Sequence, residues 1–176
     1  MKLFIIAEAG INHNGEISLA KELIKVAKLS GANAVKFQAA IPNLVCTSKS
    51  PLAKYQKTNN SETQLNLLSK IHLPLEAYKE LNQYAKELGI EFMCSAFDNF
   101  SLDYINNLGV KYHKIASGEI NHYPFLKQIA NYNKPTIVST GMATLKEIKE
   151  CLEVLTSNGL SKRNIILMHC ATDYPT

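Results

Sequence analysis

The chain has 176 residues, of which 46% are hydrophobic and 19% are charged. This balance is typical of one globular domain and excludes a low-complexity tail, a fibre or a membrane bundle. The 19 basic residues against 15 acidic ones give a formal charge of only +4, which is too small to indicate a nucleic-acid-binding surface but is compatible with a small anionic ligand.

The apolar runs of the sequence are short, and the run Leu3–Ala7 falls far below the roughly 20 residues of a membrane span. The segment after Met1 also lacks the length and the small-residue cleavage site of a secretory signal. Four cysteines lie far apart without a CxxC pair, so we expect neither a disulfide scaffold nor a zinc ribbon. We therefore expect a cytoplasmic protein with reduced thiols and no membrane association.

Short apolar runs alternate with longer segments of helical period, and this alternation predicts repeated β/α units around a parallel sheet. The runs are too short and too apolar for helices, which suits strands that are buried on both faces. The six predicted strands are Leu3–Ala7, Ala34–Phe37, Ile90–Cys94, Tyr112–Ile115, Thr136–Val138 and Ile165–Met168.

Three of the intervening segments carry the start and stop signals of helices. The first has an apolar stripe over Leu19–Ala27, with Ser18 as a candidate cap. The second keeps its helical period until it stops at Gly89. In the third, Thr144 and Glu147 have the spacing of a capping box. Shorter helices are expected after Ser101 and Tyr123.

The segment from Ala39 to Lys70 is a long polar connection, with a candidate small helix from Glu62 onward. Long ordered loops in compact domains are often functional, and a plain surface excursion is an equally good interpretation.

Six such units fit either an open doubly wound sheet or part of an eight-stranded barrel. The turn Gly10–Gly15 lacks the GxGxxG pattern of a nucleotide-binding sheet, which favours the barrel. A complete barrel usually takes roughly 250 residues. The predicted fold class is therefore α/β, of the (β/α)8 TIM-barrel type, truncated after about six β/α units.

Polar residues recur where each predicted strand ends, and in a parallel barrel these ends meet on the face that carries active sites. The residues are Glu8, Lys36, Gln38, Ser95, Asp98, Lys114, Glu119, Ser139, Thr140, His169 and Tyr174.

Lysines beside serine and threonine hydroxyls suit a phosphate or carboxylate group. Glu8 and Glu119 are candidate acid-base groups. The alternative for Glu8 and Lys36 is a structural ion pair between neighbouring strands, and for one such pair the two interpretations weigh about equally. The five histidines show no metal-binding spacing, so no metal ligand is assigned.

Five blocks of the sequence, in order, resemble the sialic acid synthase family, which comprises N-acetylneuraminate synthase and the related legionaminate and pseudaminate synthases. The resemblance spans essentially the whole chain. The blocks are IAEAGINHNG at 6–15, VKFQ at 35–38, KIASGE at 114–119, STGM at 139–142 and HCATDYP at 169–175.

The resemblance implies a transferase that condenses phosphoenolpyruvate with N-acetylmannosamine or a related hexose, releases phosphate and forms a nine-carbon sialic-type acid. By motif position, the catalytic residues would be Glu8 as the acid-base group, Lys114 and Glu119. The substrate-binding residues would be Lys36, Gln38, Ser95, Ser117, Ser139 and Tyr174.

Family resemblance also implies a homodimer and a divalent metal, Mn²⁺ or Mg²⁺, whose histidine ligands lie beyond this chain. Residues 1–176 would form the N-terminal part of the synthase barrel, without its last strands and without the C-terminal antifreeze-like domain. Two alternatives remain: an inactive fragment or module that binds phosphoenolpyruvate without turnover, and an aldolase that uses Lys114 to form a Schiff base.

Overall fold

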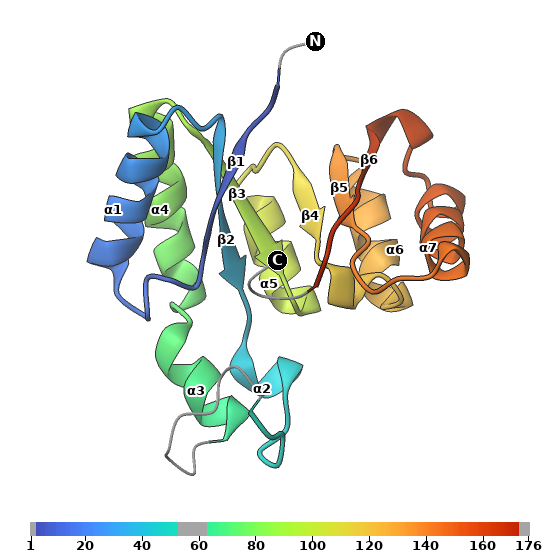
Figure 1. Ribbon diagram of the computed structural model, residues 1–176, viewed down its shortest axis with the longest axis horizontal. Coiled ribbons are helices and arrows are strands. Elements are labelled where there is room, and N and C mark those ends of the chain that lie inside the picture. The colour runs from blue at the N-terminus through green and yellow to red at the C-terminus, as the bar shows by residue number, and fades with distance from the viewer. Residues whose placement is uncertain (1–2, 53–62, 173–176) are drawn as a thin grey trace. The chain divides into compact units, whose positions relative to one another are not determined.

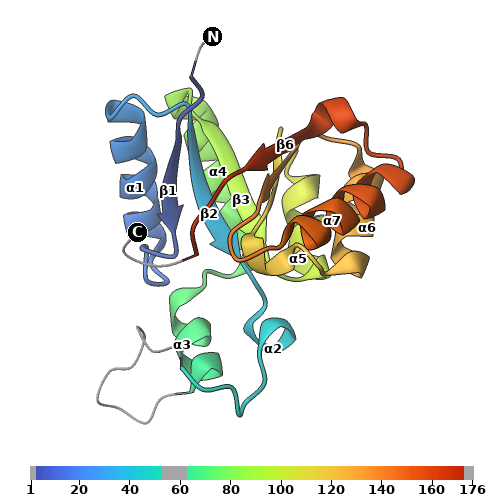
Figure 2. The same ribbon diagram turned by 45° about the vertical axis from the view of Figure 1, so that its right-hand side comes forward.

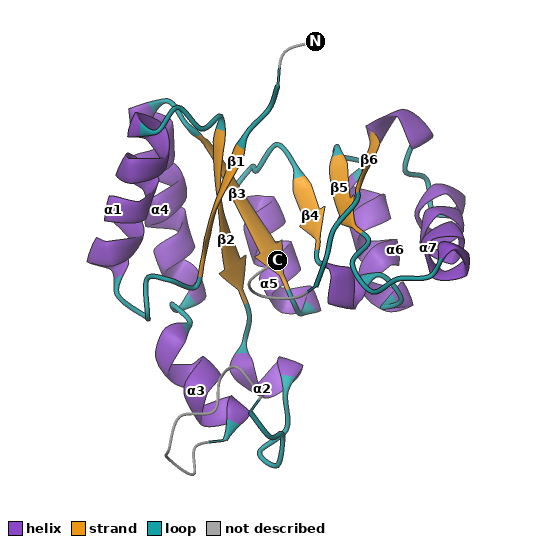
Figure 3. Ribbon diagram, in the orientation of Figure 1, coloured by secondary structure: helices purple, strands orange, loops and turns teal. Residues whose placement is uncertain are grey.

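The computed structural model describes residues 3–52 and 63–172. These residues fall into two compact units, one ending at Phe92 and the other beginning at Met93. Figure 1 colours the chain from its N-terminus to its C-terminus, and Figure 3 shows the alternation of strands and helices that the sequence predicts. Each unit is built around its own short parallel sheet.

The first unit pairs two parallel strands and covers them with helices. Its elements are β1 (Ile6–Gly10), α1 (Ile17–Leu29), β2 (Ala34–Ala39), α2 (Pro42–Val45), α3 (Gln64–Ile71) and α4 (Leu75–Leu88). Figures 1 and 2 both show α1 and α4 side by side. The fully buried side chains of Ile24, Phe37, Tyr78 and Leu81 form the core, since these two helices and β2 turn their apolar faces toward one another.

Two local predictions for this unit are wrong. The first strand lies at Ile6–Gly10 rather than at Leu3–Ala7, because its pairing with β2 begins at Ile6, and Leu3 is 74% exposed. Ser18 is not a cap: α1 begins at Ile17 after Glu16, whose side chain makes no capping hydrogen bond. The predicted small helix from Glu62 is found as α3, beginning at Gln64, and the part of that connection from 53 to 62 lies outside the described residues.

The strand β3 (Glu91–Ala96) contains the boundary in the sequence, with Glu91 and Phe92 assigned to the first unit and its remaining residues to the second. The other elements of the second unit are α5 (Asn99–Asn107), β4 (His113–Ile115), the 3-10 turn η2 (Ser117–Glu119), α6 (Tyr123–Tyr132), β5 (Thr136–Ser139), α7 (Leu145–Ser157), η3 (Lys162–Asn164) and β6 (Ile165–Met168). The strands β4, β5 and β6 are parallel neighbours in that order.

The core of the second unit fills the space between its sheet and the helices α6 and α7. It includes Ile115, Phe125, Ile129, Val138 and Leu155, each fully buried. The predicted capping box is confirmed: the Thr144 hydroxyl accepts from the Glu147 N–H, and the Glu147 carboxylate accepts from the Thr144 N–H. The predicted stop at Gly89 is also confirmed, since Gly89 ends α4 in the left-handed conformation.

The prediction that every strand is buried on both faces is wrong for β6. Ile166 and Leu167 are each 47% exposed. Within the part of the chain that the structure describes, β6 is an edge strand of its sheet, so it has a strand neighbour on one side only. No helix among residues 3–52 and 63–172 has the length and apolar character needed to cross a membrane.

Candidate functional site

Two groups of polar side chains gather at strand ends, one in each unit. In the first unit, Glu8 and Lys36 are direct neighbours across the parallel pair β1 and β2. Lys36 Nζ forms an ion pair with Glu8 Oε2. Glu8 lies inside β1, not after it as predicted, because β1 runs on to Gly10.

The third side chain of this group is that of Gln38, which lies close to Gly10. A β-carbon at Gly10 would lie 3.5 Å from Glu8 Oε1 and 3.7 Å from Gln38 Nε2, so both polar groups lie over its bare backbone. Its φ of +56° is a conformation that favours glycine. The Tyr78 hydroxyl donates to the Gln38 carbonyl at 2.6 Å, which fixes the end of β2 against α4. Glu8, Lys36 and Gln38 are therefore brought together as the sequence predicted.

In the second unit, the ammonium of Lys114 reaches from β4 to the end of β5. Its Nζ donates to the Ser139 hydroxyl at 2.5 Å and to the Ile115 carbonyl at 3.2 Å. Lys114 lies opposite Ile137, so its side chain extends along the strands toward their carboxyl ends. Both Lys114 and Ser139 are buried.

The turn after β5 adds a second hydroxyl to this unit. The Ser117 Oγ accepts a hydrogen bond from the Gly141 N–H at 3.0 Å. A β-carbon at Gly141 would clash with the Thr172 hydroxyl and lie 3.0 Å from Ser117 Oγ, so a larger residue would have to displace these side chains. The loops after β4 and β5 are thereby held together. We name Lys114, Ser117, Ser139 and Gly141 the β4–β5 cluster.

Ser95 lies near the end of β3 and is 2% exposed. The neighbouring Asp98 has a structural role. It caps α5 by accepting from the Ser101 N–H at 2.8 Å, and its other carboxylate oxygen accepts from the Ser101 hydroxyl at 2.6 Å. Tyr174, the remaining predicted site residue, lies outside the described residues.

Glu119 follows β4 in the turn η2, and its carboxylate has a partner that we did not predict from the sequence. The Nδ1 of His122 lies 2.7 Å from Glu119 Oε2. The sequence offers one signal for this contact, because a separation of three residues in a helical turn places two side chains on the same face.

Histidines and carboxylates do not gather into a metal centre in the described part of the chain: no group of three or more His, Cys, Asp or Glu side chains there could hold a metal ion. His13, which follows β1, is fully buried, and burial lowers its pKa. Its Nδ1 accepts from the Gly15 N–H at 3.2 Å, while its Nε2 finds no hydrogen-bond partner among residues 3–52 and 63–172. A lone neutral imidazole of this kind does not make a metal site.

A shallow groove lies elsewhere in the second unit, between α7 and the start of β6. None of the predicted site residues lines it. Its lining residues are Lys149, Leu152, Glu153, Thr156, Lys162, Ile165 and Leu167.

Comparisons with known proteins place these residues in context. Residues 23–176 match the model of the NeuB family. The chain is 50% identical over 176 residues to N,N'-diacetyllegionaminic acid synthase of Campylobacter jejuni, covering 99% of this chain and 53% of that protein. It is 44% identical to the protein of the same name from Legionella pneumophila, covering 99% of this chain and 50% of that protein. The chain thus spans about half the length of the curated relatives it matches.

Among solved structures, the chain resembles the N-acetylneuraminic acid (sialic acid) synthetase of Leptospira borgpetersenii with a TM-score of 0.84 and 30% identity, over 100% of this chain and 56% of that one. Together with the parallel strands in β/α order, this likeness confirms the predicted α/β fold class, with six strands of a TIM-barrel-type fold in the described part of the chain. The predicted resemblance is confirmed as well, and the chain belongs to the NeuB family.

Proposed function

We propose that this chain provides the phosphoenolpyruvate-binding portion of a synthase that condenses phosphoenolpyruvate with an N-acetylated hexose to form a sialic-type acid. The observation that carries the proposal is the β4–β5 cluster. There a buried ammonium, two serine hydroxyls and the tight Gly141 turn meet at the carboxyl ends of two parallel strands. Ligands of α/β proteins bind at such strand ends.

The chemistry of this cluster suits an anion with oxygen atoms. A lysine ammonium attracts phosphate or carboxylate as a point charge, and hydroxyls supply short, directed hydrogen bonds. The Lys114 ammonium is already buried and donates to Ser139 Oγ. An incoming anion would accept a hydrogen bond from this same ammonium, so no further charged side chain has to be buried to bind it. Phosphoenolpyruvate carries both a phosphate and a carboxylate.

In the proposed reaction, the C3 carbon of phosphoenolpyruvate forms a bond to the aldehyde carbon of the open-chain sugar. Water adds to C2, and inorganic phosphate leaves as the C2–O bond to phosphate breaks, so that a 2-keto acid remains. The aldehyde oxygen gains one proton, and the water loses two in becoming the keto oxygen, so that the second proton leaves with the phosphate. Glu8 is the carboxylate that the resemblance assigns to such proton transfers, and Glu119 is the second candidate acid-base group.

For the acceptor we propose a hexose with two acetamido groups. Both relatives described above are named N,N'-diacetyllegionaminic acid synthase, and a product with two N-acetyl groups requires an acceptor that carries both. N-acetylmannosamine, with one acetamido group, is the matched competitor.

A second candidate function is binding of phosphoenolpyruvate without turnover, which requires only the anion-binding groups of the β4–β5 cluster. The aldolase alternative is less well supported: the Lys114 Nζ faces two hydrogen-bond acceptors, an environment that suits an ammonium donor better than a nucleophilic amine.

The test is a titration of the chain with phosphoenolpyruvate, followed by phosphate release with Mn²⁺ and either sugar. We expect binding by the wild type, at least about tenfold weaker binding by Lys114→Gln, and unchanged binding by Lys111→Gln, an exposed lysine three residues earlier. Phosphate release that requires sugar supports the synthase, and binding without release supports the module. No binding by the wild type contradicts both. A borohydride-trapped pyruvate adduct at Lys114 would instead support the aldolase.

A further inference from the structure

We propose that His122 is a positioning residue for Glu119, holding its carboxylate in one orientation for the reaction. This inference rests on the proposed function, in which Glu119 serves as a site carboxylate. Its basis is the 2.7 Å contact between His122 Nδ1 and Glu119 Oε2.

The direction of this hydrogen bond follows from the chemistry of its partners. An ionised carboxylate can only accept hydrogen bonds, so Nδ1 must be the donor. A neutral His122 ring therefore carries its hydrogen on Nδ1, with Nε2 as the bare nitrogen. Which ring nitrogen is protonated is set by the hydrogen bond that the ring makes, so the tautomer of His122 reports directly on the contact with Glu119.

The imidazole is itself held in place by two anchors. Its ring stacks on Phe125, with centroids 5.4 Å apart and an interplanar angle of 16°. Phe125 is fully buried in the core of the second unit, so this platform is rigid. The His122 N–H also donates to the Glu119 carbonyl at 3.1 Å, which fixes the short turn between the two residues.

These anchors act on a carboxylate that is only 18% exposed. With Oε2 held by the imidazole, rotation of the Glu119 side chain would break a hydrogen bond in a partly desolvated place, which is costly. A ligand would then be contacted through Oε1, in a fixed direction. Supporting hydrogen bonds of this kind hold the reacting groups of active sites in a fixed orientation.

The competing explanation is purely structural, since His122 directly precedes α6 and the contact with Glu119 could only stabilise the start of that helix. The two explanations differ in what they predict for turnover. A structural role changes stability alone, whereas positioning changes the catalytic step and is restored by any side chain that can donate to Oε2.

The experiment has a spectroscopic arm that requires no turnover. In the chain with ¹⁵N-labelled histidine rings, at a pH where the rings are neutral, we expect His122 as the Nδ1–H tautomer. In Glu119→Ala we expect the ring to lose this form, with the exposed His169 unchanged as the internal reference. An Nε2–H ring in the wild type, or the same spectrum in both proteins, would overturn the inference.

The kinetic arm compares His122→Ala with His122→Asn, whose amide can still donate. We expect His122→Ala to lower kcat for phosphate release about 10- to 100-fold with little change in KM for phosphoenolpyruvate, and His122→Asn to restore most of the loss. An unchanged kcat in a folded His122→Ala overturns positioning. A wild type that shows the Nδ1–H tautomer but binds no phosphoenolpyruvate contradicts the proposed function instead, and the contact between His122 and Glu119 then stands as a structural one.

Discussion

Lys36 and Glu8 form an ion pair whose two members differ sharply in exposure: the lysine side chain is 9% exposed and the carboxylate side chain 53%. The ammonium therefore loses most of its hydration, while the carboxylate keeps much of its own. The loss of stability is therefore expected to depend on which partner is removed, because only a buried charge depends strongly on its counter-ion.

We expect Glu8→Gln to lower the free energy of unfolding by about 1 to 2 kcal/mol, because it takes the carboxylate away from a buried ammonium. Lys36→Met should cost less than about 1 kcal/mol, since it keeps the apolar stem and leaves a hydrated carboxylate. Urea unfolding measures both changes. Lys25→Met, in the exposed pair with Glu22, is the control and should change stability by less than about 0.5 kcal/mol. A larger loss in Lys36→Met than in Glu8→Gln would contradict this account.

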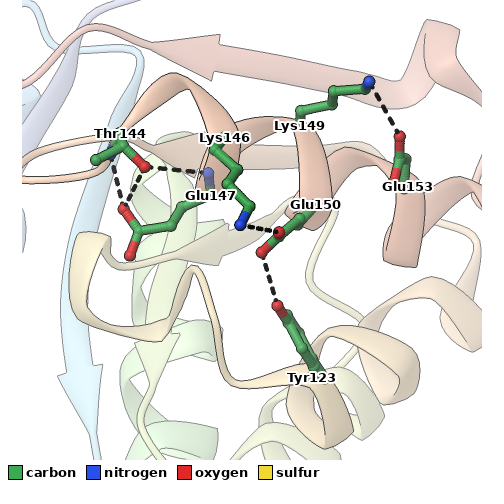
Figure 4. A network of polar contacts seen from close by, with 7 residues as sticks. All are labelled: Tyr123, Thr144, Lys146, Glu147, Lys149, Glu150 and Glu153. Carbon is green, nitrogen blue, oxygen red and sulfur yellow. Dashed lines mark hydrogen bonds and ion pairs between the residues drawn. The ribbon is translucent and has the colours of Figure 1, made fainter.

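The start of α7 allows a second test of stability. Figure 4 shows the reciprocal hydrogen bonds between Thr144 and Glu147, with the surface pairs Lys146–Glu150 and Lys149–Glu153 further along the helix. We expect Thr144→Ala to cost about 1 kcal/mol, because it removes an N-cap acceptor. Thr156→Ala, near the other end of the same helix, should cost less. Equal costs would show that the cap contributes nothing of its own.

The carboxylate of this capping box also depends on pH. Hydrogen bonds from the Thr144 N–H and hydroxyl lower the pKa of Glu147 below its ordinary 4.5. Its contribution to stability is therefore complete above that value and is lost as the pH falls through the lower folded pKa. The difference in stability between the wild type and Thr144→Ala should accordingly shrink at low pH.

Helix ends were predictable where a local interaction decides them. Thr144 and Glu147 satisfy each other within one turn, and Gly89 adopts the left-handed conformation that ends α4. Strand positions were less predictable, because they depend on pairing. The apolar residues Leu3–Ile5 have the composition of a strand, but the pairing with β2 begins only at Ile6.

The contacts of the candidate site were likewise predictable only in part. The neighbourhood of Glu8 and Lys36 follows from the order of residues along two parallel strands, which the sequence contains. The contact between Glu119 and His122, and the approach of Gly141 to Ser117, depend instead on rotamers and on the paths of loops. The three-residue spacing of Glu119 and His122 permits their contact, but the packing around the loops selects the rotamers that form it.

His113 provides a test of pH dependence. It is buried at the start of β4, stacked on Tyr132, with its Nε2 3.3 Å from Asn106 Oδ1. Burial, with a smaller contribution from the charge of Lys134, lowers the pKa of His113 from 6.5 to about 4. Between these values the unfolded chain binds a proton that the folded chain does not, so stability falls as the pH decreases from 6.5 to 4.

We expect this histidine to account for about 2 kcal/mol of the stability lost between pH 7 and pH 5, as the size of its pKa shift implies. In His113→Gln that part of the pH dependence should disappear, whatever the variant's stability at pH 7. Urea unfolding at the two pH values measures it, with His169→Gln at an exposed position as the control. A variant with the same pH dependence as the wild type would show that His113 is not the group responsible.

The turn after β5 gives the most direct test of the β4–β5 cluster. A methyl group at Gly141 would meet the Thr172 hydroxyl and press on Ser117 Oγ, whereas a methyl group at Gly118 would meet no heavy atom within 4 Å. We therefore expect Gly141→Ala to displace Ser117 and to weaken phosphoenolpyruvate binding at least about tenfold, the equivalent of roughly 1.4 kcal/mol. Gly118→Ala should bind like the wild type. Calorimetric titration of both variants, with their folding checked by circular dichroism, makes the comparison. If a folded Gly141→Ala bound phosphoenolpyruvate as tightly as Gly118→Ala, the anion would not lie against this turn, and the proposed site would have to be sought away from Ser117.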